Sequence, residues 1–157
     1  MQESRWFYSA FLCVALISAA SAPAQSPTLN SCTLDKGHYA CDEAGFAHAL
    51  KSAKTVAIEA QPFSHASEHA LENLVRDLSK TAQSEPADLT FVLFRPEAQG
   101  LFYGPGGRDL AYLRVYAHGT QSERGSLVWV ETYSGQPDLP WPAIAHQLVQ
   151  QFKDTFK

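Results

Sequence analysis

The chain has 157 residues, of which 45% are hydrophobic and 18% are charged. This length suits one domain, and the composition excludes a disordered or a collagen-like chain. The net charge of -4 provides no basic excess to hold a phosphate backbone, so nucleic acid is not an expected partner. The composition alone does not indicate a function.

The first residues follow the pattern of an export signal. The apolar run over residues 10–20 is shorter than the roughly 20 residues of a membrane-spanning helix, and alanines stand where cleavage would occur. We therefore expect a signal peptide over residues 1–24, a periplasmic or secreted protein, and no membrane span after the signal is removed. A retained anchor is the alternative, because Glu3 offsets the charge of Arg5 before the run.

Two of the three cysteines are predicted to form a disulfide. Cys13 lies within the expected signal, which leaves Cys32 and Cys41 in an oxidising compartment, where such a pair usually bonds. The sequence Asp-Lys-Gly at residues 35–37 is typical of a turn that folds the two sulfurs toward each other. A loop of this length is expected to stabilise the fold by about 2–3 kcal/mol.

The two cysteines have two alternative roles. Residues 29–32 resemble a lipoprotein cleavage site, in which Cys32 would be acylated and Cys41 would remain a free thiol. A metal site of Cys32, His38 and Cys41 is disfavoured, because the spacing matches no zinc pattern. The disulfide is the favoured prediction.

Hydrophobic periodicity predicts alternating helices and strands along the rest of the chain. Asp42 and Ser67 are the expected N-caps of the first two helices, and Pro142 opens the third. The predicted helices cover residues 43–52, 68–82 and 142–156, and the predicted strands cover residues 55–60, 89–94, 110–117 and 127–133.

This order predicts an α+β fold, a two-layer sandwich with helices on one face of a mainly antiparallel four-stranded sheet. A leader over residues 25–52, with the disulfide and the short helix, precedes a domain over residues 53–157.

The last two strands are expected to form a hairpin with an aromatic face. In the favoured register Tyr112 pairs with Tyr133, Arg114 with Glu131 and Tyr116 with Trp129, which brings opposite charges and aromatic rings together. Such an amphipathic face is typical of interfaces, so these six residues are candidate binding residues. The alternative is that the helix over residues 43–52, or a second copy of the chain, covers this face.

A second candidate is the string His65-Ala66-Ser67-Glu68-His69. It resembles the H-x-x-E-H motif of inverzincin metallopeptidases, which implies that His65 and His69 bind zinc while Glu68 activates a water molecule. Those peptidases need a further glutamate ligand on a downstream helix, whereas Glu131 is predicted on a strand here. The favoured interpretation is a polar helix start, and a zinc hydrolase is the alternative.

A third candidate is the glycine-rich connection at residues 104–107. It lacks the Lys-Ser/Thr pair of a phosphate-binding loop and is typical of a tight connection before a strand. Phe102, Tyr103 and Arg108 flank it, and a loop with two aromatic rings and a cation is a candidate binding loop.

The element order resembles small bacterial envelope domains of unknown function. Residues 55–59, 87–93 and 125–130 carry this resemblance, which is to the layout of the α/β module in the curli-secretion lipoprotein and in the amino-terminal domain of TolB. The resemblance covers residues 53–157, and the disulfide segment in front departs from it. It implies no catalytic residues.

Together these features predict an exported, non-enzymatic binding or assembly module of the bacterial envelope. Its partner is expected to be an envelope protein or a small ligand, with no cofactor and no bound metal. A small zinc hydrolase is the second hypothesis, and a secreted inhibitor of another organism's enzyme is the third. The oligomeric state is left open.

Overall fold

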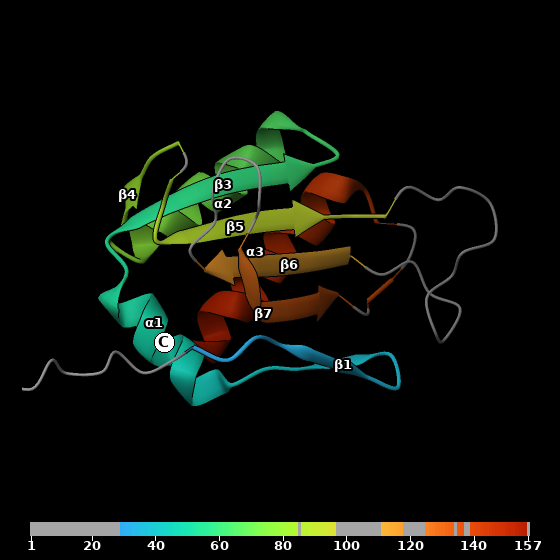
Figure 1. Ribbon diagram of the computed structural model, residues 1–157. Coiled ribbons are helices and arrows are strands. Elements are labelled where there is room, and N and C mark those ends of the chain that lie inside the picture. Colours follow the sequence, from blue (N-terminus) through green and yellow to red (C-terminus); the bar gives the residue numbers. More distant parts are fainter. Residues whose placement is uncertain are drawn as a thin grey trace, which may run out of the picture.

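A computed structural model describes residues 29–84, 86–96, 111–117, 125–133, 135–136 and 139–156. The expected signal peptide and the candidates Tyr103 and Arg108 lie outside these residues. The elements are, in chain order, β1 (Thr33–Asp35), β2 (His38–Ala40), α1 (Glu43–Ser52), β3 (Thr55–Gln61), α2 (His65–Asp77), β4 (Thr81–Ala82), β5 (Leu89–Phe94), β6 (Ala111–Ala117), β7 (Ser126–Tyr133) and α3 (Trp141–Thr155) (Figure 1).

The α+β class is confirmed, but the predicted four-stranded, mainly antiparallel sheet is wrong. The main sheet is five-stranded and mixed, with the strand order β4-β3-β5-β6-β7. β3 runs parallel to both β4 and β5, while β5, β6 and β7 are antiparallel neighbours. The reason is that α2 carries the chain back across the sheet between β3 and β5, so both strands start at the same end.

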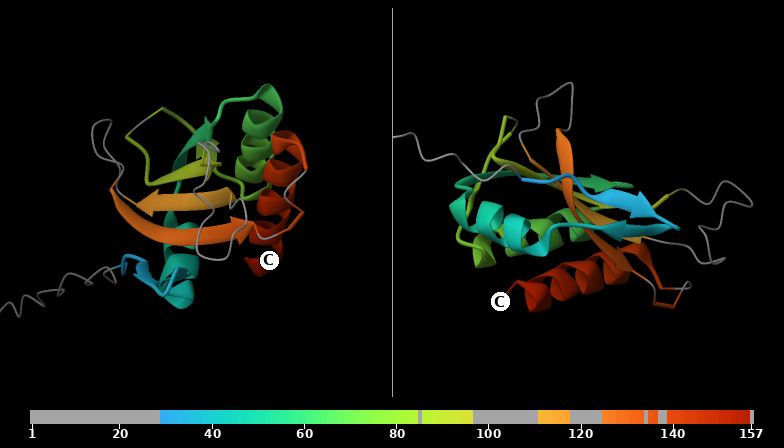
Figure 2. Two further views of the ribbon diagram at one scale, coloured as in Figure 1. Left: turned by 90° about the vertical axis from the view of Figure 1, so that its right-hand side faces the viewer. Right: turned by 60° about the horizontal axis from the view of Figure 1, so that its bottom comes forward.

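The two longer helices, α2 and α3, cover one face of the sheet (Figure 2). The core lies between these helices and the sheet. On the sheet side it holds the alternate residues that point toward the helices, such as Phe91 and Val115, which are fully buried. On the helix side it holds the apolar stripes of α2 and α3, namely Leu71, Leu74, Val75, Ile144, Leu148, Val149 and Phe152.

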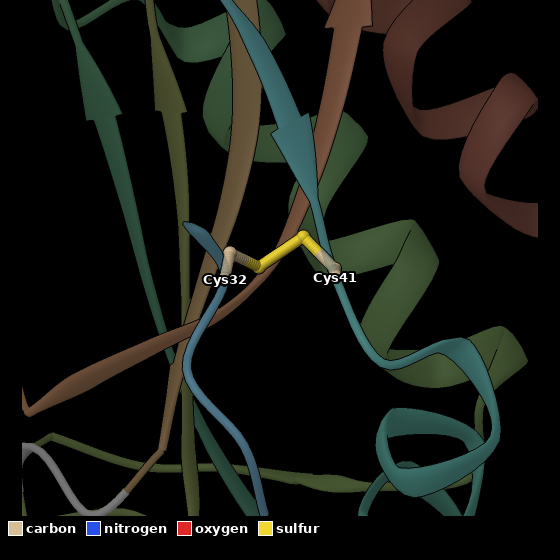
Figure 3. The surroundings of a disulfide bond; sticks show 2 residues. All are labelled: Cys32 and Cys41. Carbon is tan, nitrogen blue, oxygen red and sulfur yellow. A yellow bond between two sulfur atoms is a disulfide. The ribbon is translucent and has the colours of Figure 1, made fainter. Parts of the chain in front are cut away.

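The cysteine segment forms a small sheet of its own. β1 and β2 pair as an antiparallel hairpin, and Cys32 and Cys41 are joined by a disulfide at its open end (Figure 3). The predicted disulfide is therefore present. The Cys32 N–H donates a hydrogen bond of 2.7 Å to the carbonyl oxygen of Leu127, which connects the hairpin to the outer edge of β7.

α1 begins as the sequence predicts and belongs to the main core. The Asp42 carboxylate accepts a hydrogen bond of 2.9 Å from the Gly45 N–H, which is the expected N-cap. Phe46 on α1 is fully buried, and its ring lies 5.3 Å from Trp129 and 5.1 Å from Phe156. α1 therefore shares its core with the sheet and α3.

The predicted bounds of the second helix are wrong at both ends. α2 starts three residues earlier because Ser64, and not Ser67, is the N-cap: its side chain accepts a hydrogen bond of 3.1 Å from the Ser67 N–H. Ser67 is fully buried in the first turn. The helix ends at Asp77 because Ser79 takes a positive φ of 55°, after which residues 81–82 form β4.

α3 is placed against the end of β3. Its first residue, Trp141, donates a hydrogen bond of 2.8 Å from the indole nitrogen to the carbonyl oxygen of Pro62. Pro142 follows in the first turn, as the sequence indicates. Among the described residues, no helix is long and apolar enough to cross a membrane.

The role of α1 in the core gives a first prediction. Replacing Phe46 by alanine removes a fully buried ring, so we expect Phe46→Ala to lower the free energy of unfolding by about 3–5 kcal/mol. Urea denaturation followed by circular dichroism measures the change. His48 is an exposed residue of the same helix, and His48→Ala is expected to change stability by less than about 0.5 kcal/mol. Equal effects of the two variants would show that α1 does not stabilise the core.

Candidate functional site

The register of β6 and β7 divides the predicted aromatic face between the two faces of the sheet. Arg114 lies opposite Val130 and Val115 lies opposite Trp129, with a β-bulge between Val115 and Tyr116. The predicted pairs Tyr112–Tyr133, Arg114–Glu131 and Tyr116–Trp129 are therefore wrong. A shift of one residue turns every side chain of a strand to the other face, and the bulge adds a second shift.

The three β7 candidates lie on the face that is covered by the helices. The Trp129 ring lies 5.3 Å from Phe46 and 4.8 Å from Phe156, both on helices or at a helix end. Tyr133 is only 3% exposed, and its hydroxyl donates a hydrogen bond of 3.3 Å to the Gln136 carbonyl oxygen. Trp129 and Tyr133 therefore act in packing rather than in forming an open platform.

Glu131, the third β7 candidate, is a half-buried carboxylate. Burial raises its pKa, because it removes water from the charged form. The indole N–H of Trp129 acts in the opposite direction, but it does not reach full hydrogen-bonding geometry in this conformation. The protonated form of Glu131 is thus favoured by the fold relative to the same residue in the unfolded chain.

The three β6 candidates lie together on the opposite face of the sheet. Tyr112, Arg114 and Tyr116 alternate along β6 with buried residues of the core, and each is partly exposed. They face away from α2 and α3, on the side where the β1–β2 hairpin lies (Figure 2). These three of the six predicted binding residues therefore lie on one face of the sheet.

Arg114 is the centre of this face. Its guanidinium carbon lies 4.7 Å from the ring centroid of Phe94 and 4.8 Å from that of Tyr112, so the cation contacts two aromatic rings. Phe94 and Tyr112 are opposite residues of β5 and β6, and their rings stack at 6.5 Å. We call Phe94, Tyr112 and Arg114 the arginine cluster.

The disulfide hairpin contributes a fourth side chain beside the arginine cluster. Tyr39 of β2 meets Tyr112 edge to face, with ring centroids 6.2 Å apart. Burial and the neighbouring Tyr39 raise the pKa of Tyr112, and the Arg114 cation opposes that rise. The Tyr112 hydroxyl therefore remains protonated at neutral pH, as a donor and acceptor.

The guanidinium has an unused donor. The Nε of Arg114 is buried and has no hydrogen-bond partner among the described residues. No described carboxylate lies within ion-pair distance of it. A buried N–H group without an acceptor costs about 1–3 kcal/mol.

The neighbouring strands extend the polar character of this face. Val92 lies between Glu59 and Arg114 in the register of the three central strands and is fully buried. Gln61, opposite Phe94, donates a hydrogen bond to the Glu59 carboxylate. The face thus combines rings, a cation, a carboxylate and an amide group.

The residues of the H-x-x-E-H string do not converge. His65 is the first residue of α2 and contacts the exposed ring of Phe63 at 5.2 Å. His69 lies 3.3 Å from the Glu72 carboxylate, and both side chains are exposed. Glu68 lies in the first turn, where its negative charge interacts favourably with the helix dipole. Within the described part of the chain, no three His, Cys, Asp or Glu side chains are arranged to hold a metal ion.

Sequence reasoning missed two members of this face. Phe94 ends a continuous apolar strand, a pattern that indicates burial and not a surface role. Tyr39 lies between the two cysteines, and only the position of the hairpin beside β7 brings it to Tyr112. The disulfide closes the hairpin but does not position it on the main sheet, so no local signal in the sequence identifies Tyr39.

No known protein family, curated protein or solved structure matches the chain. The similarity in layout to the curli-secretion and TolB modules therefore stays a prediction.

The burial of Glu131 gives a prediction about pH. Because its pKa in the folded state is raised above the ordinary value of 4.5, ionisation disfavours the fold. The stability of the wild type relative to Glu131→Gln should be highest below this value and should fall as pH rises through the folded pKa. Chemical denaturation of both proteins at a series of pH values measures the difference.

Asp77 provides a control of opposite sign. Its hydrogen bond with Lys153, 2.6 Å long, lowers the pKa of Asp77 below the ordinary 3.8. The stability of the wild type relative to Asp77→Asn should therefore be lost as pH falls through the folded pKa. A Glu131 difference that has the same sign as the Asp77 difference would contradict the assignment.

Proposed function

We propose that the chain is an exported, non-enzymatic binding module of the bacterial envelope, and that it binds its ligand at the arginine cluster. The observation that carries this proposal is the Arg114 guanidinium, which contacts two aromatic rings on a partly exposed face of the sheet. Cations stacked on aromatic rings and flanked by tyrosine are frequent at the centres of binding sites.

The chemistry of the cluster supports binding and not catalysis. A guanidinium stays charged at physiological pH and does not exchange a proton with a substrate. The raised pKa of Tyr112 likewise keeps its phenol from acting as a base near neutrality. The ligand group that suits this set is an oxygen acceptor such as a carboxylate or a phosphate, carried by an envelope protein or by a small ligand.

Export is supported by the disulfide. Cys32 and Cys41 are bonded, and bonds of this kind persist in the periplasm and outside the cell. Processing after Ala24 is the proposed step that releases the chain from the membrane.

The intact mass of the protein recovered from the cell envelope and the culture fluid tests export. We expect a chain that starts at Gln25, less two hydrogens for the disulfide, with no mass added at Cys32. An acyl chain on Cys32, or a retained amino terminus, would contradict the proposal. Iodoacetamide labelling with and without a reductant provides the control for the disulfide.

Substitution of Arg114 tests the binding site. Arg114→Gln removes the cation from the partly exposed sheet face, so we expect at least a tenfold loss in retained ligand, which is about 1.4 kcal/mol. Arg114→Lys should restore little, because an ammonium group cannot form the same paired hydrogen bonds. The measurement is quantitative mass spectrometry of the material that the immobilised protein retains from envelope extract.

Arg76→Gln is the matched control for this experiment. Arg76 is exposed on α2, on the other side of the sheet, and its replacement removes the same charge. Ligand retained equally by the wild type and by Arg114→Gln, or lost equally in both variants, would exclude the arginine cluster as the site. Near-ultraviolet circular dichroism of each variant checks that the fold is kept.

A further inference from the structure

A groove lies at the ends of the three helices, apart from the arginine cluster. It has a volume of about 820 Å³ and is lined by Glu43, Ala44, Ala47, Leu50, Lys51, Leu78, Lys80, Thr155 and Phe156. Every one of these residues is described, and none belongs to the arginine cluster. Both views of Figure 2 show α1 beside the carboxyl end of α3.

The floor of the groove is apolar. Ala44 and Ala47 lie on the outer side of α1, where their small side chains leave the space open. Leu78 at the end of α2 and Phe156 at the end of α3 form the walls, and both are partly buried. An alkyl chain on this floor would remove apolar surface from water on both molecules.

One end of the groove is cationic. The Lys80 ammonium donates hydrogen bonds of 2.7 Å to the Ala53 carbonyl oxygen and 3.3 Å to the Lys51 carbonyl oxygen. These two bonds hold the ammonium group in place and leave its third N–H for a ligand. The exposed Lys51 side chain at the same end of α1 adds a second positive charge.

The other end of the groove has a different charge. Glu43 is eight residues before Lys51 on α1, a separation of about 12 Å along the helix axis. The acidic group is therefore one helix length away from the two lysines. A ligand with one anionic end and an apolar chain matches this arrangement of charges. Its anionic group would contact the lysines, and its apolar chain would lie along the floor of the groove.

We propose that this groove binds a single-chain carboxylate amphiphile, such as a fatty acid. Its carboxylate accepts hydrogen bonds from Lys80 and Lys51, and its alkyl chain lies along Ala44 and Ala47 between the walls. This proposal is independent of the arginine cluster, because the two sites share no residue.

Nuclear magnetic resonance titration with dodecanoate, below its micelle concentration, tests the proposal. We expect saturable shifts of the amide signals of Ala44, Ala47 and Leu50. Affinity should rise from octanoate to decanoate to dodecanoate, by up to about fourfold for each methylene that is buried. Dodecyltrimethylammonium should bind at least tenfold more weakly than dodecanoate. Equal binding of the cation would overturn the role of the lysines, and an absence of saturable shifts would overturn the site.

Matched variants localise the binding. Lys51→Glu should weaken dodecanoate binding at least tenfold. Lys54→Glu, which makes the same charge change at an exposed position outside the lining, should weaken it less than twofold. Ala47→Trp should block the groove, whereas His48→Trp on the same helix should not. Equal effects within either pair would contradict binding in this groove, and the unliganded spectra show whether each variant is folded.

Discussion

The pairing of β6 with β7 is the constraint on which the other features of this protein depend. With Val115 opposite Trp129 and a bulge beside them, both Val128 and Trp129 contact the core on the helix side. The Trp129 ring then provides the surface on which Phe46 of α1 stacks. Docking of α1 in turn fixes where the disulfide hairpin lies, because only Cys41 and Asp42 separate β2 from α1. The alternative register would place Trp129 on the other face and leave α1 without this contact.

Two surfaces with different chemistry result from this arrangement. The arginine cluster lies on the sheet face opposite α2 and α3, where Arg114 contacts two rings. The groove lies among the ends of the three helices and has an apolar floor with lysines at one end. Because α1 contributes to the groove while the hairpin before it contributes Tyr39 to the other face, one short amino-terminal segment supports both surfaces.

Local signals predicted individual elements well where neighbouring residues alone decide the structure. The bounds of α1 and β5 agree with the predicted ones, because a capping aspartate and a continuous apolar strand act within a few residues. The start of α2 was predicted at the wrong serine, since Ser64 and Ser67 are equally good caps in sequence. The structure places Ser67 in a fully buried site within the helix and leaves Ser64 to cap it.

The sequence by itself determined the α+β class, the disulfide between Cys32 and Cys41, and the position of Arg114 between tyrosines on one strand. Hydrophobic periodicity and the spacing of the cysteines are enough to predict these features, because each depends on residues that are close in the sequence. Only the tertiary structure decided that β3 and β5 are parallel, that Trp129 faces the helices, and that Phe94 and Tyr39 meet Tyr112. Each of these depends on which strands pair and in what register. That choice is settled by packing between residues far apart in the chain, since the cross-strand pairs of the rejected register are equally favourable locally.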